Sequence, residues 1–112
     1  MIEKILLDYL SDALPVPCYV SMPEKPSGSF CVLEKTGSGP DDGLEHATIA
    51  VQSYGTHVLE AASLNLQVIA AMRDAVALPA ISSCERNTDY NFPETTRRLP
   101  RYQAVFDLVY YN

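Results

Sequence analysis

The chain has 112 residues, of which 47% are hydrophobic and 20% charged, and its formal net charge is −6. This length and composition indicate one globular domain with its own core, and they exclude a disordered or fibrous chain. An acidic chain is a poor ligand for nucleic acid, whose binding depends on neutralising phosphates, and no apolar run reaches the roughly 20 residues of a membrane helix, so we expect no sequence-specific nucleic-acid partner and no membrane partner.

The first predicted elements are a helix over residues 2–13 and strands over 18–22 and 30–35. Apolar side chains recur along the opening segment at the spacing of an amphipathic helix: Ile2, Ile5, Leu6, Tyr9, Leu10 and Ala13. Pro15 and Pro17 end this helix and favour extended backbone. Acidic residues also interrupt the opening MIEKILLDYL, which argues against a signal peptide, so the cytosol is the expected compartment.

A glycine-rich segment, residues 36–43, follows the second strand and leads into a third strand over residues 44–53. Its sequence, TGSGPDDG, is rich in turn residues and predicts a loop between the two strands, long enough to become ordered against a partner. In the third strand Ala47, Ile49 and Val51 alternate with polar residues, which indicates one buried face.

A helix over residues 57–77 is the longest predicted element, and Thr56 is its predicted N-cap. Its buried stripe is predicted to be Leu59, Ala62, Leu66, Ile69 and Val76, widened by Val58, Val68 and Met72. A modest strand over 81–86, a loop or wide hairpin over 87–100 and a clear strand over 102–111 complete the chain. This order predicts an α+β fold, in which an antiparallel or mixed sheet of four to five strands packs against the long helix and the N-terminal helix.

The glycine-rich segment does not match a phosphate-binding loop. A P-loop places its Lys and its Ser or Thr after the glycines and opens into a helix, whereas here Lys35 and Thr36 come first and a strand follows. Asp41 and Asp42 would repel an anion, and together with Glu45 they lack the spaced ligands of a calcium loop. We therefore expect no phosphate site.

The histidines and cysteines give no catalytic or metal-binding signature. His46 lies in the middle of a strand and His57 at the start of a helix, neither in the context of a nucleophile elbow or a cysteine protease. Cys18, Cys31 and Cys84 are widely spaced and include no C-x-x-C pair. The expectation is a protein without catalytic residues, metal or cofactor.

Charge is distributed unevenly along the chain. All of the net negative charge comes from residues 1–60, whereas residues 61–112 are neutral overall. Arg97, Arg98 and Arg101 lie within five residues of one another. This cluster is either a solvated loop or a patch that meets an acidic surface, such as one on a neighbouring copy.

Six segments carry a family resemblance: MIEKILLDYL, VPCYVSMPEKP, FCVLEKTGSG, ATIAVQSYG, EAASLNLQVIAAM and RYQAVFDLVYY. In this order they resemble small prophage-encoded proteins of the tail-terminator or tail-completion type, which belong to the head–tail joining genes of long-tailed phages. The resemblance spans nearly the whole chain. It consists of strands and helices, with no catalytic residue to carry over.

The resemblance implies a non-enzymatic structural protein that assembles into a ring, often a hexamer, which caps the tail tube and offers a surface to the head connector. The implied partners are other copies of the chain, tail-tube proteins and head-connector proteins. The implied locations are the bacterial cytoplasm before assembly and the head–tail junction of the virion afterwards. A closed ring joins two different surfaces, and the expected pair is Arg97, Arg98 and Arg101 against Asp41, Asp42 and Glu45 of a neighbour.

Two other classes of protein remain open at this point. A cytosolic adaptor or small-ligand-binding dimer would use the exposed sheet, and a pocket near His46, between the long helix and the sheet, would favour it. A thiol-dependent enzyme would need a cysteine with a low pKa.

Overall fold

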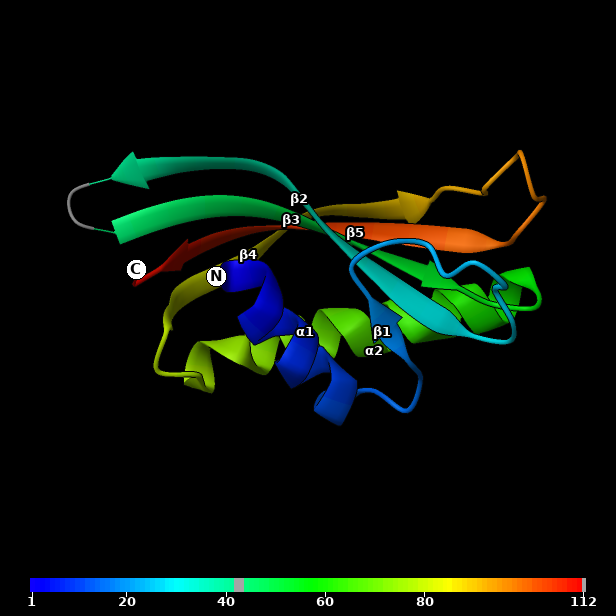
Figure 1. Ribbon diagram of the computed structural model, residues 1–112, viewed down its shortest axis with the longest axis horizontal. Coiled ribbons are helices and arrows are strands. Elements are labelled where there is room, and N and C mark those ends of the chain that lie inside the picture. The colour runs from blue at the N-terminus through cyan, green and yellow to red at the C-terminus, as the bar shows by residue number, and fades with distance from the viewer. Residues whose placement is uncertain (42–43, 112) are drawn as a thin grey trace.

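The computed structural model describes residues 1–41 and 44–111. In chain order the elements are α1 (Ile2–Ala13), β1 (Cys18–Tyr19), β2 (Phe30–Asp41), β3 (Leu44–Tyr54), α2 (Val58–Asp74), the short 3-10 helix η1 (Ala75–Ala77), β4 (Ile81–Asn91) and β5 (Arg101–Tyr110). Both long helices lie on the same side of the sheet (Figure 1). Among the described residues, no helix is long and apolar enough to cross a membrane.

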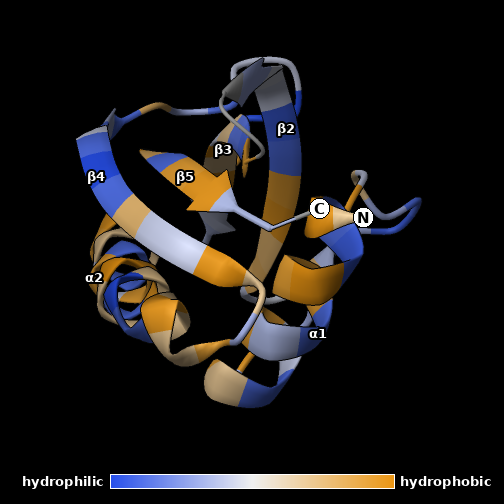
Figure 2. Ribbon diagram, turned by 90° about the vertical axis from the view of Figure 1, so that its left-hand side faces the viewer, coloured by the Kyte–Doolittle hydropathy of each residue, from blue (hydrophilic) through white to orange (hydrophobic). Residues whose placement is uncertain are grey.

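The five strands form one mixed sheet in the order β1-β2-β3-β5-β4. The β1–β2 pair is parallel, and the β2–β3, β3–β5 and β4–β5 pairs are antiparallel. This confirms the predicted α+β fold, in which a mixed sheet packs against an N-terminal helix and a longer helix. Seen along the long axis, α1 lies beneath the β2 side of the sheet and α2 beneath the β4 side (Figure 2).

The main core fills the space between the sheet and the two helices. Its largest fully buried side chains come from both layers: Ile2, Leu6 and Leu10 of α1, Val68 and Met72 of α2, and Leu33, Ile49, Val51, Phe106 and Leu108 of the strands. Burying one such side chain stabilises the fold by about 1.5–3 kcal/mol. The helices also contact each other directly, because the hydroxyl of Tyr9 donates to the carbonyl oxygen of Ala71 at 2.6 Å.

A second, smaller apolar cluster lies on the opposite face of the sheet. It consists of Phe30, Val32 and Tyr54, with Met22 and Leu99 packed against it. The rings of Phe30 and Tyr54 are stacked, with their centroids 4.6 Å apart. The cluster therefore holds two connecting segments against the sheet, the one between β1 and β2 and the one between β4 and β5.

Three strands differ in length from their predictions. β1 ends at Tyr19 instead of residue 22, β4 continues to Asn91 instead of ending at 86, and β2 continues to Asp41 instead of ending at 35. A bulge between Lys35 and Gly37 shifts the register, and beyond it β2 continues to pair with β3 as far as Asp41. The loop predicted over 36–43 was therefore wrong for residues 36–41, and the rest of it lies outside the described residues.

The buried face of α2 also differs from the prediction. Ala61, Leu64, Asn65, Val68 and Met72 are buried, whereas Leu59 and Leu66, predicted to be buried, are 77% and 66% exposed. The helix is apolar on two sides, and the side that packs against the sheet contains the polar residue Asn65, so its sequence pattern does not indicate burial. Its side-chain nitrogen donates to Asp89 Oδ1 of β4 at 3.3 Å.

The start of α2 is one residue later than expected. Its N-cap is His57, not Thr56, and the ring nitrogen Nδ1 of His57 accepts a hydrogen bond from the Glu60 N–H. The Glu60 carboxylate reaches back to the Thr56 N–H at 2.8 Å and accepts a hydrogen bond from the Ser29 hydroxyl. The helix ends at Asp74, and η1 replaces its predicted last turn.

Candidate assembly surfaces

The connection between β4 and β5 carries Arg97 and Arg98 at its tip, and both side chains are exposed. Glu94 and Leu99 exchange two backbone hydrogen bonds of 2.9 Å, which close the base of this turn. The Glu94 carboxylate accepts hydrogen bonds from the backbone N–H groups of Arg97 and Thr96, each at 2.8 Å. These hydrogen bonds lower the pKa of Glu94, and the bond from the Arg97 N–H has the largest effect. We call this ordered turn, residues 94–99, the arginine turn.

Arg101 lies at the base of the same connection but is occupied within its own chain. Its Nε donates to the carbonyl oxygen of Phe92 at 2.6 Å, and another guanidinium nitrogen donates to the Tyr54 hydroxyl at 3.1 Å. The guanidinium also stacks over the Phe92 ring, 4.2 Å from its centroid. Arg101 therefore supports the arginine turn, and Arg97 and Arg98 are the side chains that this end presents.

The predicted acidic partners lie where β2 ends and β3 begins. Asp41 is the last residue of β2. Glu45 is half-buried in β3 and stands opposite Pro40 of β2 and Tyr110 of β5. Asp42 lies outside the described residues. We call Asp41 and Glu45 the acidic end.

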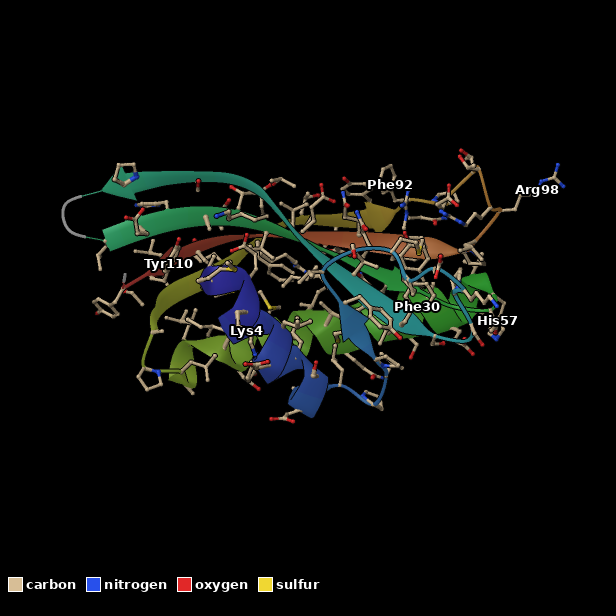
Figure 3. All side chains as sticks on the ribbon, viewed as in Figure 1. Lys4, Phe30, His57, Phe92, Arg98 and Tyr110 are labelled. Carbon is tan, nitrogen blue, oxygen red and sulfur yellow. The ribbon has the colours of Figure 1, made fainter. Side chains whose placement is uncertain are left out.

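The arginine turn and the acidic end lie at opposite ends of an elongated molecule. Its longest dimension is 42 Å, against 24 Å in each of the other two directions. The end of β2 and the start of β3 are at the left of Figure 1, and Arg98 extends from the right-hand end in Figure 3. The register agrees, because Glu45 at the start of β3 pairs with Tyr110 and Tyr54 at its end pairs with Arg101. The arginine turn and the acidic end therefore cannot meet within one chain.

An exposed apolar surface begins at the same end as the arginine turn. Val58, Leu59 and Leu66 are exposed on α2, and we call them the outer patch. Leu59 and Leu66 are two helical turns apart and so share a side of the helix. The backbone N–H of Gly55, just before α2, donates to Pro100 beside the arginine turn at 3.2 Å, and His57 lies at the same end as Arg98 in Figure 3.

The outer patch is the feature that sequence reasoning missed. The sequence contained a signal for it, since α2 has one apolar series at Leu59 and Leu66 and a second at Leu64, Val68 and Met72. A single sheet covers only one side of a helix, so a helix with two apolar sides leaves one of them exposed. Which side would be free depended on Asn65 and on the position of β4.

The alternative of a small-ligand-binding dimer predicts a pocket near His46, and a hollow of about 470 Å³ lies beside this residue. It is lined by three neighbouring strands, including Gly37 and Pro40 of β2, Thr48 of β3 and Asp107 of β5. None of its lining residues belongs to α2, so it is not the pocket between helix and sheet that this alternative predicts. Within the part of the chain that the structure describes, no group of three or more His, Cys, Asp and Glu residues is placed to hold a metal ion.

The three cysteines are free thiols, with Cys31 buried and Cys18 and Cys84 half-buried. Burial raises the pKa of Cys84 to about 11. Cys84 is therefore not the low-pKa cysteine of a thiol-dependent enzyme.

Comparison of the sequence with models of known protein families gave no match, and comparison with curated proteins gave none either. The resemblance to tail-terminator proteins therefore stays a prediction, carried by the sequence segments.

Proposed function

We propose that the protein is a ring-forming structural subunit of the phage tail-terminator or head–tail joining kind. The observation that carries the proposal is the placement of opposite charges at the two ends of one elongated molecule. Since the arginine turn and the acidic end cannot meet within a chain, their contact joins one copy to the next, head to tail. A head-to-tail contact is heterologous, and it generates a ring when its rotation closes.

The outer patch supplies the apolar part of such a contact. Typical interfaces have an apolar centre and a polar rim. The outer patch begins in the first turn of α2, beside His57, which lies at the same end as Arg98 (Figure 3), and Leu66 follows two turns further along the helix. Covering two leucines contributes about 3 kcal/mol or more, whereas an exposed ion pair contributes about 0.2–1 kcal/mol. In this proposal the apolar patch supplies most of the affinity, and the charges set orientation and salt dependence.

The first test is the mass of the protein in solution, measured by light scattering after size exclusion over a range of protein and salt concentrations. The proposal expects a discrete ring-sized oligomer that dissociates as salt rises, because salt screens exposed charges beyond about 8 Å at physiological ionic strength. A stable dimer would support the adaptor instead. A chain that is monomeric at every concentration and does not bind isolated tail tubes would overturn the proposal.

Charge reversal tests the proposed seam, by which we mean the contact of the arginine turn with the acidic end of the next copy. Arg97→Glu with Arg98→Glu should weaken assembly by roughly 5- to 30-fold, the equivalent of about 1–2 kcal/mol. Asp41→Lys with Glu45→Lys in a second chain should restore assembly when the two variants are mixed. Lys4→Glu with Lys25→Glu is the control, since both are exposed and the total charge change is the same. Equal effects of the two glutamate variants would show that net charge matters and that this seam does not exist.

A further inference from the structure

Three polar or thiol side chains form a row across the first three strands on the core-facing side of the sheet. Cys18 of β1 is the register partner of Cys31 of β2, and Cys31 is the register partner of Ser53 of β3. Cys31 and Ser53 are buried, and the Cys31 sulfur lies 3.9 Å from the Ser53 hydroxyl oxygen. The ring-forming proposal makes no use of this row.

We propose that Cys18 and Cys31 are a redox-active dithiol, which a small-molecule disulfide such as glutathione disulfide oxidises to a cross-strand disulfide. Neighbouring strands lie about 4.8 Å apart, and the Cα atoms of a disulfide are usually about 4.4–6.8 Å apart, so register partners on adjacent strands have a suitable backbone separation. Both side chains belong to the same main apolar cluster, so they lie on the same face of the sheet. β1 has only two residues, so a small shift of this strand as the bond forms would disturb few ladder hydrogen bonds.

The surroundings give the two thiols different roles. Cys18 is half-buried and Cys31 fully buried, so an external disulfide meets Cys18 first. A hydrogen bond with the Cys31 thiol lowers the pKa of Cys18, because a donated hydrogen bond stabilises the thiolate. The same bond and burial raise the pKa of Cys31. Cys18 is therefore the attacking thiol and Cys31 the resolving thiol.

The exchange is balanced in two steps. The Cys18 thiolate attacks one sulfur of glutathione disulfide, which forms a mixed disulfide and releases one glutathione thiolate. Cys31 then gives up its proton and attacks the Cys18 sulfur, which forms the Cys18–Cys31 bond and releases the second glutathione thiolate. The protein loses two electrons and two protons, and glutathione disulfide is reduced to two glutathione molecules.

Oxidation would close the segment between the two strands into a covalent loop. This segment carries Met22, which packs against Phe30, Val32 and Tyr54 on the other face of the sheet. The disulfide would therefore fix the residues that cover this cluster. The inference is independent of whether the chain assembles.

The test is to incubate the folded full chain with a glutathione redox buffer, quench it with acid and unfold it, and then follow its intact mass, its alkylation by a maleimide and the cross-links in its peptide map. The expected result is a mass lower by two hydrogen atoms, loss of two alkylatable thiols and a peptide pair joining Cys18 to Cys31. The Cys84→Ser variant should give the same product in the same yield. The Cys18→Ser variant should keep its thiols free of any internal disulfide, with its fold checked by circular dichroism.

Other products would overturn the proposal. A glutathione adduct on Cys18 that persists without cross-linking would show that Cys31 does not resolve it. A Cys18–Cys84 pair in similar yield would show that strand register does not direct the reaction. Full maleimide labelling of all three thiols after incubation would show that the folded chain is not oxidised.

Discussion

Among the glycines that the structure describes, Gly55 is the one at which an added methyl group should lower the stability of the fold most. It precedes α2, and a Cβ atom built on it would lie 2.6 Å from the backbone nitrogen of Ala61 and 3.1 Å from that residue's Cα. Its φ angle is not in the left-handed region, so glycine is needed here for space. The first turn of α2 could not yield by rotating a side chain, because the clashing atoms belong to the backbone.

The size of the effect follows from what must move. The closest ordinary contact is about 3.4 Å, so the start of α2 has to shift by roughly 0.8 Å, and overpacking of this kind costs about 1–3 kcal/mol. The shift also strains the His57 cap and the hydrogen bond from Gly55 to Pro100, and loss of a cap costs about 1 kcal/mol. We therefore expect Gly55→Ala to lower the free energy of unfolding by about 2–3 kcal/mol.

Urea unfolding followed by circular dichroism measures this change. With a slope of about 1–1.5 kcal/mol per molar urea, the midpoint should fall by about 2 M. Gly39→Ala is the matched control, because a Cβ atom there meets nothing within 4 Å, and its midpoint should stay within about 0.5 M of the wild type. Equal midpoints for the two variants would refute the close-approach argument.

Three further predictions concern the arginine turn, acid stability and the outer patch. Arg98 has a φ angle of 56°, in the left-handed region that costs energy for a residue with a Cβ atom. Arg98→Gly should therefore raise the free energy of unfolding by about 1 kcal/mol while weakening assembly in light scattering. A loss of stability would show that the backbone at Arg98 is not strained. The Ser29 hydrogen bond lowers the pKa of Glu60, so the ionised Glu60 carboxylate contributes stability above its unfolded-state pKa, and this contribution is lost as pH falls through the folded-state pKa. The free energy of unfolding of Glu60→Gln should therefore fall less than that of the wild type between about pH 5 and pH 3. Identical pH profiles for the two proteins would argue against this role of Glu60. Leu66→Lys should leave the free energy of unfolding within about 0.5 kcal/mol of the wild type and weaken assembly. Gln67→Lys, also exposed, should leave both stability and assembly unchanged; equal assembly of both variants would exclude the outer patch.

The elements that could be predicted were those with a strong local period. The N-terminal helix ends at Ala13, as its period and Pro15 predict. The last strand follows its alternation of buried and exposed residues to within one residue at each end. In both cases neighbours along the chain determine the structure, so a single sequence carries enough information.

The errors occurred where distant residues decided the outcome. Gly37 and Gly39 favour turns locally, yet pairing with β3 holds both in a strand. The pairing of Cys18 with Cys31 depends on a parallel register between β1 and β2, which no local pattern encodes. The charged ends are an intermediate case, since the sequence identified the residues and only the antiparallel sheet placed them at opposite ends.

The segment between the two cysteines and the arginine turn pack against the same apolar cluster, and this gives a last prediction. Leu99 of the arginine turn and Met22 of the β1–β2 connection both pack against the cluster of Phe30, Val32 and Tyr54. Fixing Met22 by oxidation should therefore restrain Leu99 through the apolar side chains they share, a contiguous packed route for coupling.

Amide hydrogen exchange measures this coupling, because the Leu99 N–H bonds to the Glu94 carbonyl oxygen at 2.9 Å and exchanges only when the turn opens. The Leu99 amide should exchange more slowly in the oxidised chain than in the reduced chain, and equally slowly in oxidised Cys84→Ser. The Cys18→Ser variant should show no difference between the two conditions. If oxidation slows exchange only in residues 18–31, the cluster does not transmit the restraint, and the redox state of the dithiol has no physical route to the surface that we propose for assembly.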